Sequence, residues 1–576
     1  MRVVPDVAGL DKHFDYVVPT AMADRVQVGS MVRVLLHGRR VGGWVTEIGP
    51  STEVAPDRLV PIAKWSGHGP DADLIDLARW AGPRWGTTRL RPFLVTASPP
   101  SMVTALPPPS RSSHPRALAG RAVDPVADAV LDGGGGVMRL PPADDVVPTL
   151  LTAARLGPIL VVHPSIDGAR SLAARLRQLG FAVALHPEQW ALAAAGADVV
   201  VGTRAATWAP CPGVRAIVVV DEHDEALQEE RSPTWHARDV AIERARRAGV
   251  PCLLVSPSPS VTALHWAGRR VGRPAMVDEH AGWPVVEVVD RGEEEAGRRS
   301  LLSSSVIQAL RDRDRRVVCV LNTTGRARLL SCRSCRSIQR CERCDAAVAQ
   351  RDDRVLECRR CGTTRPPVCP VCGSSALGNV RPGLTRAREE IEAAAGRPVV
   401  AVSGAHAERA VDDGAEVFVG TEAVLHRVGR ADLVAFLDLD GELLAPRYRA
   451  GEQAMALLVR AARLLGPRAR GGRLVLQTHV PDHEVIQAVL HTDPTRLARA
   501  DAARRRDLQL PPFAAIAALT GPGAAELAEA TGLTWSGSGE AVLIRAATWD
   551  DLGPTIASTP RPRGANVRVE VDPPRR

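Results

Sequence analysis

Lysine is nearly absent from this chain of 576 residues, which contains Lys12 and Lys64 and no lysine after them. Since lysine and arginine together number 73, the other 71 basic residues are arginine. The phosphate-binding loop of nucleotide hydrolases requires a lysine that reaches the β and γ phosphates. A phosphate loop of this kind is therefore excluded from residues 65–576.

The chain also lacks a long apolar segment. No run of about 18 uninterrupted apolar residues occurs, so the sequence predicts no membrane span and no membrane partner. The first segment carries Asp6, Asp11 and Asp15 and has no continuous apolar core, which is not typical of a secretory signal peptide. C-x-x-C pairs without such a signal indicate metal binding in a reducing compartment, and we expect a cytoplasmic protein.

Composition sets wide limits on the fold and on the partners. With 45% hydrophobic and 24% charged residues, the chain is typical of a globular protein that buries large cores. Its length predicts roughly three to four domains. A net charge of +8 and a pI near 9.1 are a modest basic excess, which permits nucleic-acid binding without demonstrating it.

Cysteine is concentrated in one short stretch. Eight of the 11 cysteines lie between Cys332 and Cys372, arranged as four C-x-x-C pairs. Two such pairs supply the four thiolates of a tetrahedral zinc site, so four pairs predict two zinc ions per chain. A four-cysteine site leaves no position for water or substrate, which indicates structural zinc. Spacing alone leaves three ways of grouping the pairs.

The first 96 residues are predicted to form a small β domain with a trailing helix. Short β-rich runs alternate with turn residues up to about residue 65, and residues 73–80 have helical spacing. Residues 97–136 are rich in proline, serine and glycine, which is typical of a linker. A short helix is expected within this linker, at residues 124–131.

The remaining chain predicts two α/β lobes. Strands and helices alternate over residues 137–284, and again over 285–331 and 373–480, which indicates two doubly wound parallel sheets in tandem. The cysteine stretch, residues 332–372, is inserted into the second lobe. Residues 481–576 are expected to form a C-terminal α+β domain.

The first lobe carries an acidic pair that is typical of nucleotide-driven motors. The apolar strand 216–220 ends at Asp221 and Glu222, which in a motor hold Mg²⁺ and activate water. Acids also cap parallel strands for structural reasons, so the pair alone does not establish catalysis. Residues 136–145, where the phosphate loop should fall, contain two prolines without backbone donors and two aspartates that would repel a triphosphate. ATP is therefore not expected as a cofactor, and the acidic pair is interpreted as vestigial.

Several motifs in a fixed order carry a family resemblance. They are Phe14-Asp15-Tyr16 with Gly38, Val201 to Arg204, Asp221-Glu222-His223, Trp235 to Asp239, the eight cysteines, Asp438 to Gly441, Val475 to His479, and Gln509 to Pro512. Together they resemble the PriA family of primosomal replication restart proteins, which are superfamily 2 DNA helicases. The resemblance covers most of the chain.

The resemblance implies roles for particular residues. In the family the N-terminal domain holds the 3′ end of a nascent DNA strand. By this resemblance Asp15 would accept a hydrogen bond from the terminal 3′ hydroxyl, Phe14 would stack on the last base, and Gly38 would belong to the same pocket. It also implies a nested grouping of the cysteines. One zinc would be held by Cys332, Cys335, Cys369 and Cys372, and the other by Cys341, Cys344, Cys358 and Cys361.

The chain departs from the family where the family uses ATP. The phosphate loop is missing, and the motif after Gly420-Thr421 has His426-Arg427 in place of lysine and glycine. The arginine-finger motif aligns with residues 460–467, where Leu464 and Pro467 replace both arginines. The family's winged-helix domain has no counterpart, and neither does the lysine of its 3′-end pocket.

These observations predict a restart factor without a motor. Such a protein would bind branched or forked DNA and promote primosome assembly and helicase loading through contacts with primosome proteins and the replicative helicase or its loader. One alternative is an active ATP-dependent 3′–5′ DNA helicase, for which DNA-stimulated ATP turnover would be the evidence. A second alternative is a zinc-stabilised scaffold for protein interactions, which would not bind forks.

Overall fold

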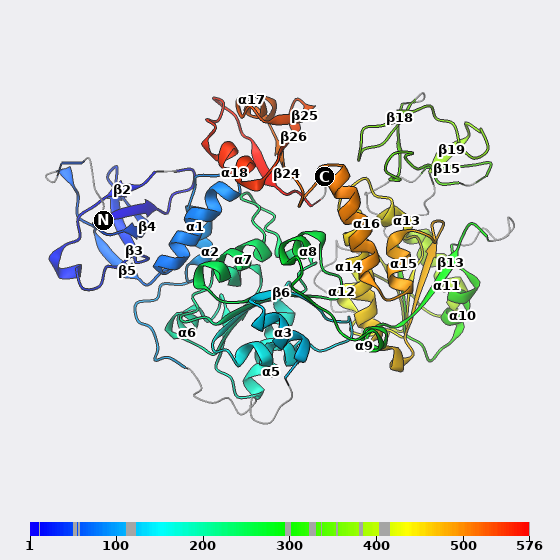
Figure 1. Cartoon of the computed structure of the whole chain (residues 1–576), viewed down its shortest axis with the longest axis horizontal. Helices are drawn as coiled ribbons and strands as arrows, with labels where there is room; N and C mark the ends of the chain where they lie inside the picture. Colours follow the sequence, from blue (N-terminus) through cyan, green and yellow to red (C-terminus); the bar gives the residue numbers. More distant parts are fainter. Residues whose placement is uncertain are drawn as a thin grey trace.

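The computed structural model describes residues 1–10, 12–49, 54–55, 58–110, 123–293, 301–321, 330–335, 337–352, 355–379, 384–402 and 415–574. Figure 1 shows a small N-terminal sheet beside the first of two α/β lobes, the second lobe on the other side, and a C-terminal sheet above their junction. The cysteine-rich module lies at the outer edge of the second lobe (Figure 1). Within the described ranges, no helix has the length and apolarity needed to cross a membrane.

The N-terminal domain is a five-stranded sheet of order β2-β1-β4-β3-β5. Its strands are β1 (Arg2–Pro5), β2 (Phe14–Asp15), β3 (Met31–Leu36), β4 (Arg39–Glu47) and β5 (Lys64–Gly67). His37 and Gly38 join β3 to β4, and both have positive φ, 47° and 75°. This conformation is typical of a two-residue hairpin turn whose twist matches that of the strands. Tyr16 and Trp65 are buried in the core beneath the sheet.

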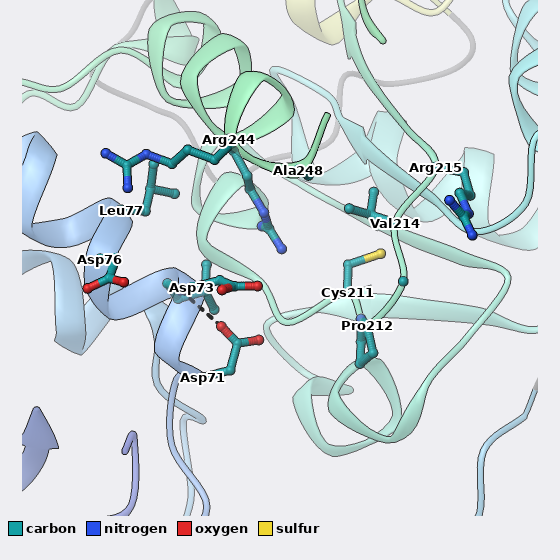
Figure 2. A pocket seen from close by; sticks show the side chains of 13 residues that line it. Asp71, Asp73, Asp76, Leu77, Cys211, Pro212, Val214, Arg215, Arg244 and Ala248 are labelled. Atoms are coloured by element: carbon teal, nitrogen blue, oxygen red, sulfur yellow. Dashed lines mark hydrogen bonds between the residues drawn. The ribbon is translucent and has the colours of Figure 1, made fainter. Parts of the chain in front are cut away.

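Two helices, α1 (Ala72–Arg84) and α2 (Arg91–Ala97), join this domain to the first lobe. Asp71 caps α1 by accepting a hydrogen bond from the Leu74 amide at 2.9 Å. A hollow of about 420 Å³ separates the start of α1 from helix α7 (Ala237–Ala248) of the first lobe. Figure 2 shows the acids of α1, including Asp73, across this hollow from Arg244 of α7. The two parts therefore meet through groups of opposite charge.

The first lobe contains a seven-stranded parallel sheet of order β12-β6-β11-β10-β7-β9-β8. Its strands are β6 (Gly135–Arg139), β7 (Ile159–Val162), β8 (Val183–His186), β9 (Val199–Gly202), β10 (Ala216–Val220), β11 (Cys252–Ser256) and β12 (Val271–Gly272). Its other helices are α3 (Pro125–Asp132), α4 (Val147–Ala154), α5 (Ile166–Gln178), α6 (Trp190–Ala195), α8 (Val261–Ala267) and α9 (Met276–Ala281). The central strand β10 is fully buried, as its apolar sequence predicts.

The expected linker, residues 97–136, is shorter in the structure. Helix α3 and strand β6 already belong to the first lobe, which therefore starts near Asp124 and not at residue 137. The first two residues of β6 are glycines that close packing requires. A Cβ on Gly135 would lie 2.4 Å from the Cys252 carbonyl oxygen, and one on Gly136 would lie 2.2 Å from that of Arg270. Residues 111–122 of the expected linker lie outside the described residues.

The second lobe contains a six-stranded parallel sheet of order β13-β23-β22-β14-β21-β20. Its strands are β13 (Val285–Asp290), β14 (Val317–Val320), β20 (Val400–Val402), β21 (Val417–Gly420), β22 (Leu433–Phe436) and β23 (Arg473–Thr478). Its helices are α10 (Ser304–Arg311), α11 (Leu384–Ala395), α12 (Val424–Arg427), α13 (Asp440–Leu443), α14 (Ala450–Leu465), α15 (Glu484–Leu490) and α16 (Pro494–Asp507). Val485 and Leu497, from α15 and α16, share a core with α14, so the lobe extends beyond the predicted residue 480.

The C-terminal domain is a four-stranded antiparallel sheet of order β25-β26-β24-β27 with two helices. Its elements are β24 (Ala515–Thr520), α17 (Ala524–Ala530), β25 (Thr534–Ser538), β26 (Ala541–Ala546), α18 (Trp549–Ser558) and β27 (Arg568–Val571). Arg84 of α1 stacks on Trp549 of α18, with the guanidinium carbon 4.4 Å from the ring centroid, and pairs with Asp239 of α7 at 3.2 Å. One arginine thus joins the N-terminal region, the first lobe and the C-terminal domain.

Candidate functional site

All four C-x-x-C pairs adopt the same local backbone. In each pair the amide of the first cysteine donates to the carbonyl five residues further on: Cys332 to Ser337, Cys341 to Ala346, Cys358 to Thr363, and Cys369 to Ser374, at 2.8–3.0 Å. Asp345, Gly362 and Gly373 occupy the position before these acceptors, with φ of 58°, 74° and 72°. This tight turn points both thiols of a pair to one side, as a metal site requires.

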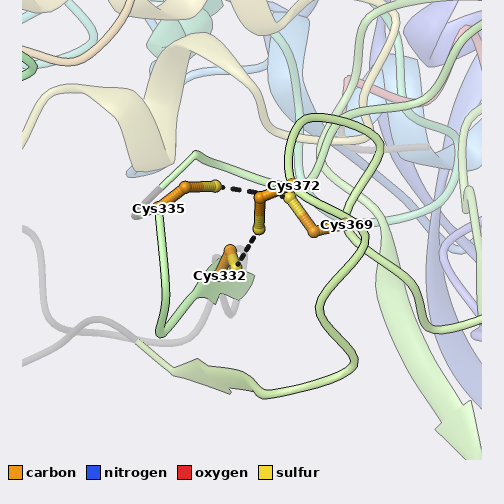
Figure 3. A group of neighbouring side chains, drawn as sticks. All are labelled: Cys332, Cys335, Cys369 and Cys372. Carbon is orange, nitrogen blue, oxygen red and sulfur yellow. Dashed lines mark hydrogen bonds between the residues drawn. The ribbon is translucent and has the colours of Figure 1, made fainter.

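The turns bring the eight cysteines together as two sets of four. The outer cluster is formed by Cys332, Cys335, Cys369 and Cys372, and the inner cluster by Cys341, Cys344, Cys358 and Cys361. Within each set the sulfur atoms lie within 4.8 Å of one another. In the outer cluster the Cys332–Cys372 and Cys335–Cys369 sulfurs are 3.5 Å apart (Figure 3). Four sulfurs at about 2.3 Å from a tetrahedral zinc lie about 3.8 Å apart, so each cluster could hold one such ion.

The inner cluster is part of the second lobe's packing. Cys341, Cys344 and Cys358 are buried. Arg360, between the last two ligands, donates to the carbonyl oxygens of Ala445 and Arg447 at 2.8 and 3.1 Å. The neighbouring Ala347 amide donates to the Leu444 carbonyl at 2.7 Å, and its side chain enters the lobe's core. The inner cluster is therefore held against the second lobe by hydrogen bonds and by apolar packing.

The outer cluster is more exposed to solvent. Cys335 and Cys372 are exposed, and only Cys332 and Cys369 are buried. Strands β15 (Leu330–Cys332) and β19 (Leu377–Asn379) pair at the base of the module. The Ser337 hydroxyl lies 3.0 Å from the Cys369 sulfur and 3.2 Å from that of Cys335. One hydroxyl thus contacts two of the four outer sulfurs, beside the backbone amides that also donate to the thiols of this cluster.

The cleft between the lobes has a distinctive segment where a phosphate loop would stand. The chain leaves β6 at Arg139, passes Pro141 and Pro142, and enters α4 at Val147. The two prolines have no amide to donate, and the next amide, that of Ala143, donates to the Gly282 carbonyl. This segment therefore offers few of the backbone donors that cradle a phosphate.

Asp221 directly follows β10 and lies in the left-handed region, with φ of 53°. Both its carboxylate oxygens accept hydrogen bonds from Arg463 of α14, at 2.6 and 2.5 Å. The Nε of the same guanidinium donates to the Pro142 carbonyl at 3.3 Å. Burial opposes the ionisation of Asp221, but Arg463 outweighs it and holds the pKa of this carboxyl well below its usual range. The Asp221 carboxylate, which in a motor would bind Mg²⁺, is therefore bound by Arg463 of the second lobe.

Glu222 is committed to contacts within the first lobe. It accepts hydrogen bonds from Arg238 at 2.9 Å and from the amide and hydroxyl of Ser260 at 3.1 and 2.6 Å. Arg238 also pairs with Asp239 at 2.9 Å. Burial opposes the charge on Arg238, while Asp239 and Glu222 raise its pKa. Both carboxylate oxygens of Glu222 thus have hydrogen-bond partners within the first lobe, which indicates a structural role.

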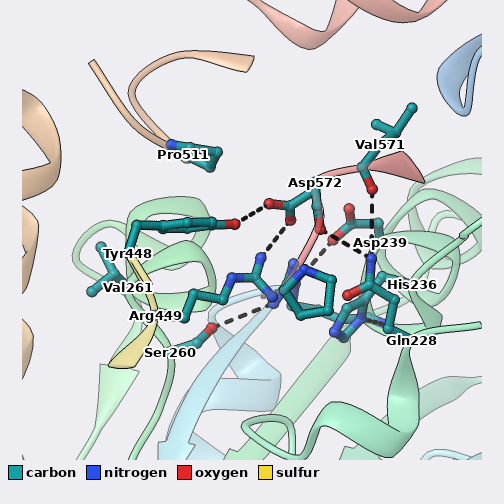
Figure 4. Close-up of polar contacts among 12 residues, drawn as sticks. Gln228, His236, Asp239, Ser260, Val261, Tyr448, Arg449, Pro511, Val571 and Asp572 are labelled. Atoms are coloured by element: carbon teal, nitrogen blue, oxygen red, sulfur yellow. Dashed lines mark hydrogen bonds and ion pairs between the residues drawn. The ribbon is translucent and has the colours of Figure 1, made fainter. Parts of the chain in front are cut away.

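A third buried acid, Asp572, lies where both lobes meet the C-terminal domain (Figure 4). Its carboxylate accepts hydrogen bonds from the Tyr448 hydroxyl and from Arg449, both at 2.5 Å and both from the second lobe. Its carbonyl accepts from Gln228 of the first lobe at 3.1 Å. Burial opposes ionisation, but Arg449 outweighs it and lowers the pKa of Asp572. The C-terminal sheet is therefore fixed to both lobes at one point.

The predicted end-binding residues lie in two places on the N-terminal sheet. Phe14 and Asp15 form β2, where the Asp15 carboxylate accepts a hydrogen bond from Arg2 at 3.2 Å. Gly38 lies in the exposed β3–β4 turn. The Tyr16 hydroxyl donates to the Leu35 carbonyl at 3.2 Å, which connects the end of β2 with the strand that leads to this turn. Binding of a 3′ end by these residues is a prediction.

Sequence reasoning missed the arginines that fill the cleft. Alignment with the family drew attention to Leu464 and Pro467, where arginine is lost. Arg460 and Arg463, three residues apart on one face of α14, instead reach across to Asp224 and Asp221. The signal present in the sequence is the spacing of these two arginines in the otherwise apolar stretch 454–465.

Comparison with known proteins identifies relatives of the chain. Residues 2–90 match the family model of the PriA 3′DNA-binding domain (3′BD). Replication restart protein PriA of Bacillus subtilis is 28% identical over 345 residues, which are 56% of this chain and 43% of that protein. The protein named probable replication restart protein PriA in Mycobacterium bovis is 29% identical over 580 residues, covering 90% of this chain and 85% of the relative. Among solved structures, the Escherichia coli DEAH/RHA helicase HrpB matches at a TM-score of 0.32 and 14% identity, over 62% of this chain and 42% of that chain.

Proposed function

We propose that this chain, which resembles the replication restart protein PriA, binds branched DNA at stalled replication forks and promotes primosome assembly and replicative helicase loading. The observation that carries this proposal is the match of residues 2–90 to the PriA 3′DNA-binding domain. The N-terminal domain would hold the 3′ end of the nascent strand, with Asp15 accepting from the terminal hydroxyl and Phe14 against the last base. The partners would be primosome proteins and the replicative helicase or its loader.

This fork-binding role would not include ATP-driven unwinding. Two prolines in the phosphate-loop position and the pairing of Asp221 with Arg463 support this part of the proposal, because both remove groups that would bind Mg²⁺-ATP. The expected result is that DNA does not stimulate ATP hydrolysis. Turnover that is lost in an Asp221→Ala variant would instead establish an active motor.

Both cysteine clusters would hold zinc, as structural ions. Two sets of four thiolates at tetrahedral spacing support this assignment, and closed four-cysteine sites leave no coordination position for a substrate. Metal analysis of protein purified without chelator should give close to two zinc ions per chain. A ratio near zero would refute the assignment.

Fluorescence anisotropy on two forked DNAs tests the end-binding role. The forks differ only in whether the leading strand ends in a 3′ hydroxyl or a 3′ phosphate. We expect tighter binding to the hydroxyl, because a phosphate places a negative charge against Asp15 and removes the donor. Asp15→Asn should reduce this preference.

Asp6→Asn is a matched control for the Asp15 variant. Asp6 lies in the same domain and is also paired with an arginine, Arg91, at 2.8 Å, but it is at the other end of β1. Its variant should keep the preference for the hydroxyl. Equal binding to both forks by the unmodified protein would reduce the function to general DNA binding. Absence of fork binding would favour a scaffold that contacts proteins only.

A further inference from the structure

We propose that the two lobes are latched shut by their own side chains, so that the closed arrangement of this chain needs no nucleotide. Motor lobes of this class open and close as a ligand enters and leaves the cleft between them. Here, side chains of α14 in the second lobe bind the acidic loop that follows β10 in the first. The inference deepens the proposed function, because it concerns the same degenerate cleft.

The latch consists of three contacts along one face of α14, which together form a ladder. Gln453, Arg460 and Arg463 are separated by seven and three residues, which places them on one side of α14. In the same order they contact Glu225, Asp224 and Asp221. Three turns of a helix in one lobe therefore pair with three acids of the other.

Two of these three contacts are ion pairs, and in both the acid is better protected from water than the arginine. The Asp221 side chain is 8% exposed and receives Arg463 in a two-pronged pair, the strongest geometry for this combination. Arg460 pairs with Asp224 at 2.6 Å and also contacts His426. Burial and Arg460 together lower the pKa of His426 to about 4, so this histidine is neutral and accepts from the arginine. Opening the cleft would leave the carboxylates of Asp221 and Asp224 partly buried and without their arginine partners, which costs free energy.

Other contacts hold α14 against the first lobe at its N-terminal end. Glu452 accepts a hydrogen bond from the Val261 amide at the start of α8, at 2.7 Å. Arg449, which precedes α14, is bound to Asp572 of the C-terminal domain, and Gln228 of the first lobe donates to the same residue. The helix is therefore fixed to the first lobe both along its face and at its beginning.

A permanently closed pair of lobes would behave as one rigid body. Nucleotide would have no second conformation to stabilise, because a ligand shifts an equilibrium only through different affinities for its two states. The surface formed jointly by the two lobes would then keep one geometry at all times. Such a surface suits a protein that positions DNA and partners and does not move along DNA.

Single-molecule energy transfer between positions 170 and 388 tests the latch. Both positions are exposed, one on α5 of the first lobe and one on α11 of the second, and unnatural residues can carry the dyes there without using cysteine. The unmodified protein should give one narrow distribution that Mg²⁺-ATP does not change. Arg460→Ala with Arg463→Ala should add a population of lower transfer efficiency, and ATP should not remove it.

A charge exchange separates the latch from a simple loss of stability. Asp221→Arg alone places two arginines together and should open the lobes, whereas Asp221→Arg combined with Arg463→Asp should restore the narrow distribution. Arg246→Ala, which removes the ion pair of the exposed Arg246 with Glu243 inside α7, is the matched control and should change nothing. An ATP-dependent shift in the unmodified protein would overturn the latch, as would an unchanged distribution in the double alanine variant. Fork binding is measured separately, so failure of one proposal does not imply failure of the other.

Discussion

The two cysteine clusters have the same ligands and the same turns, but their surroundings differ. The inner cluster has three buried cysteines and is tied to the second lobe through Arg360 and Ala347. The outer cluster has two exposed cysteines and stands on a short two-stranded base. Ligand type decides which metal fits a site, whereas packing around the site decides how much of the fold depends on that metal. The clusters should therefore contribute differently to stability.

The largest effect is expected from Cys358→Ser in the inner cluster. Loss of a buried ligand should release one zinc and disrupt the contacts between the inner cluster and residues 444–447. We expect this to lower the free energy of unfolding by about 4 kcal/mol. Zinc analysis should fall from two ions to one, and thermal unfolding of the lobes should shift to lower temperature. Unchanged thermal stability would show that the inner cluster is independent of the lobe.

Arg360→Ala tests the connection and leaves every ligand in place. The carbonyl oxygens of Cys344, Ala445 and Arg447 would lose their charged donor, which should destabilise the second lobe by about 2 kcal/mol. Both zinc ions should be retained. Denaturant unfolding measures the first quantity and metal analysis the second. Arg359→Ala is the matched control, because Arg359 is the neighbouring arginine and is exposed.

Cys372→Ser in the outer cluster should release one zinc with little effect on the lobes. We expect a cost below about 1 kcal/mol in the unfolding of the lobes, because Cys372 is exposed. Calorimetry on the same samples as for Cys358→Ser gives the direct comparison. Equal destabilisation by both variants would contradict the difference between the clusters.

The smallest structural change with a measurable effect is Ser337→Ala. The hydroxyl supports two outer sulfurs, so its loss should weaken the outer site by about tenfold and leave the fold intact. Competition with a coloured chelator should then remove one zinc earlier than in the unmodified protein. Thr363→Ala makes the equivalent change at Cys361 of the inner cluster and should have a smaller effect, since burial already limits access there.

Local patterns in the sequence predicted much of the fold. The helix expected at residues 124–131 is α3, Pro125–Asp132, and the apolar strand before Asp221 is β10. Four C-x-x-C pairs predicted metal sites, although spacing left three groupings open and the nested one came from the family resemblance. The linker prediction is wrong in part because glycine does not always indicate flexibility: Gly135 and Gly136 are required by the closeness of neighbouring backbone.

What the sequence could not reveal are contacts between distant residues. Arg463 and Asp221 are 242 positions apart, and no local pattern connects them. The same holds for Asp572, whose partners come from both lobes. Such contacts depend on how whole domains pack, and their absence from the prediction explains why the cleft was expected to be merely degenerate. In the structure the cleft is filled.

The scarcity of lysine has a practical consequence for handling the protein. Its primary amines are Lys12, Lys64 and the N-terminus, and all of them lie in the N-terminal domain. Both lysines are exposed, and Lys12 is two residues before Phe14. Amine-reactive dyes, cross-linkers and sensor surfaces will therefore attach to the domain proposed to hold the DNA end and leave the lobes unmodified. Binding measured after amine coupling would underestimate affinity for forks, and labelling with and without DNA offers a footprint of that domain alone.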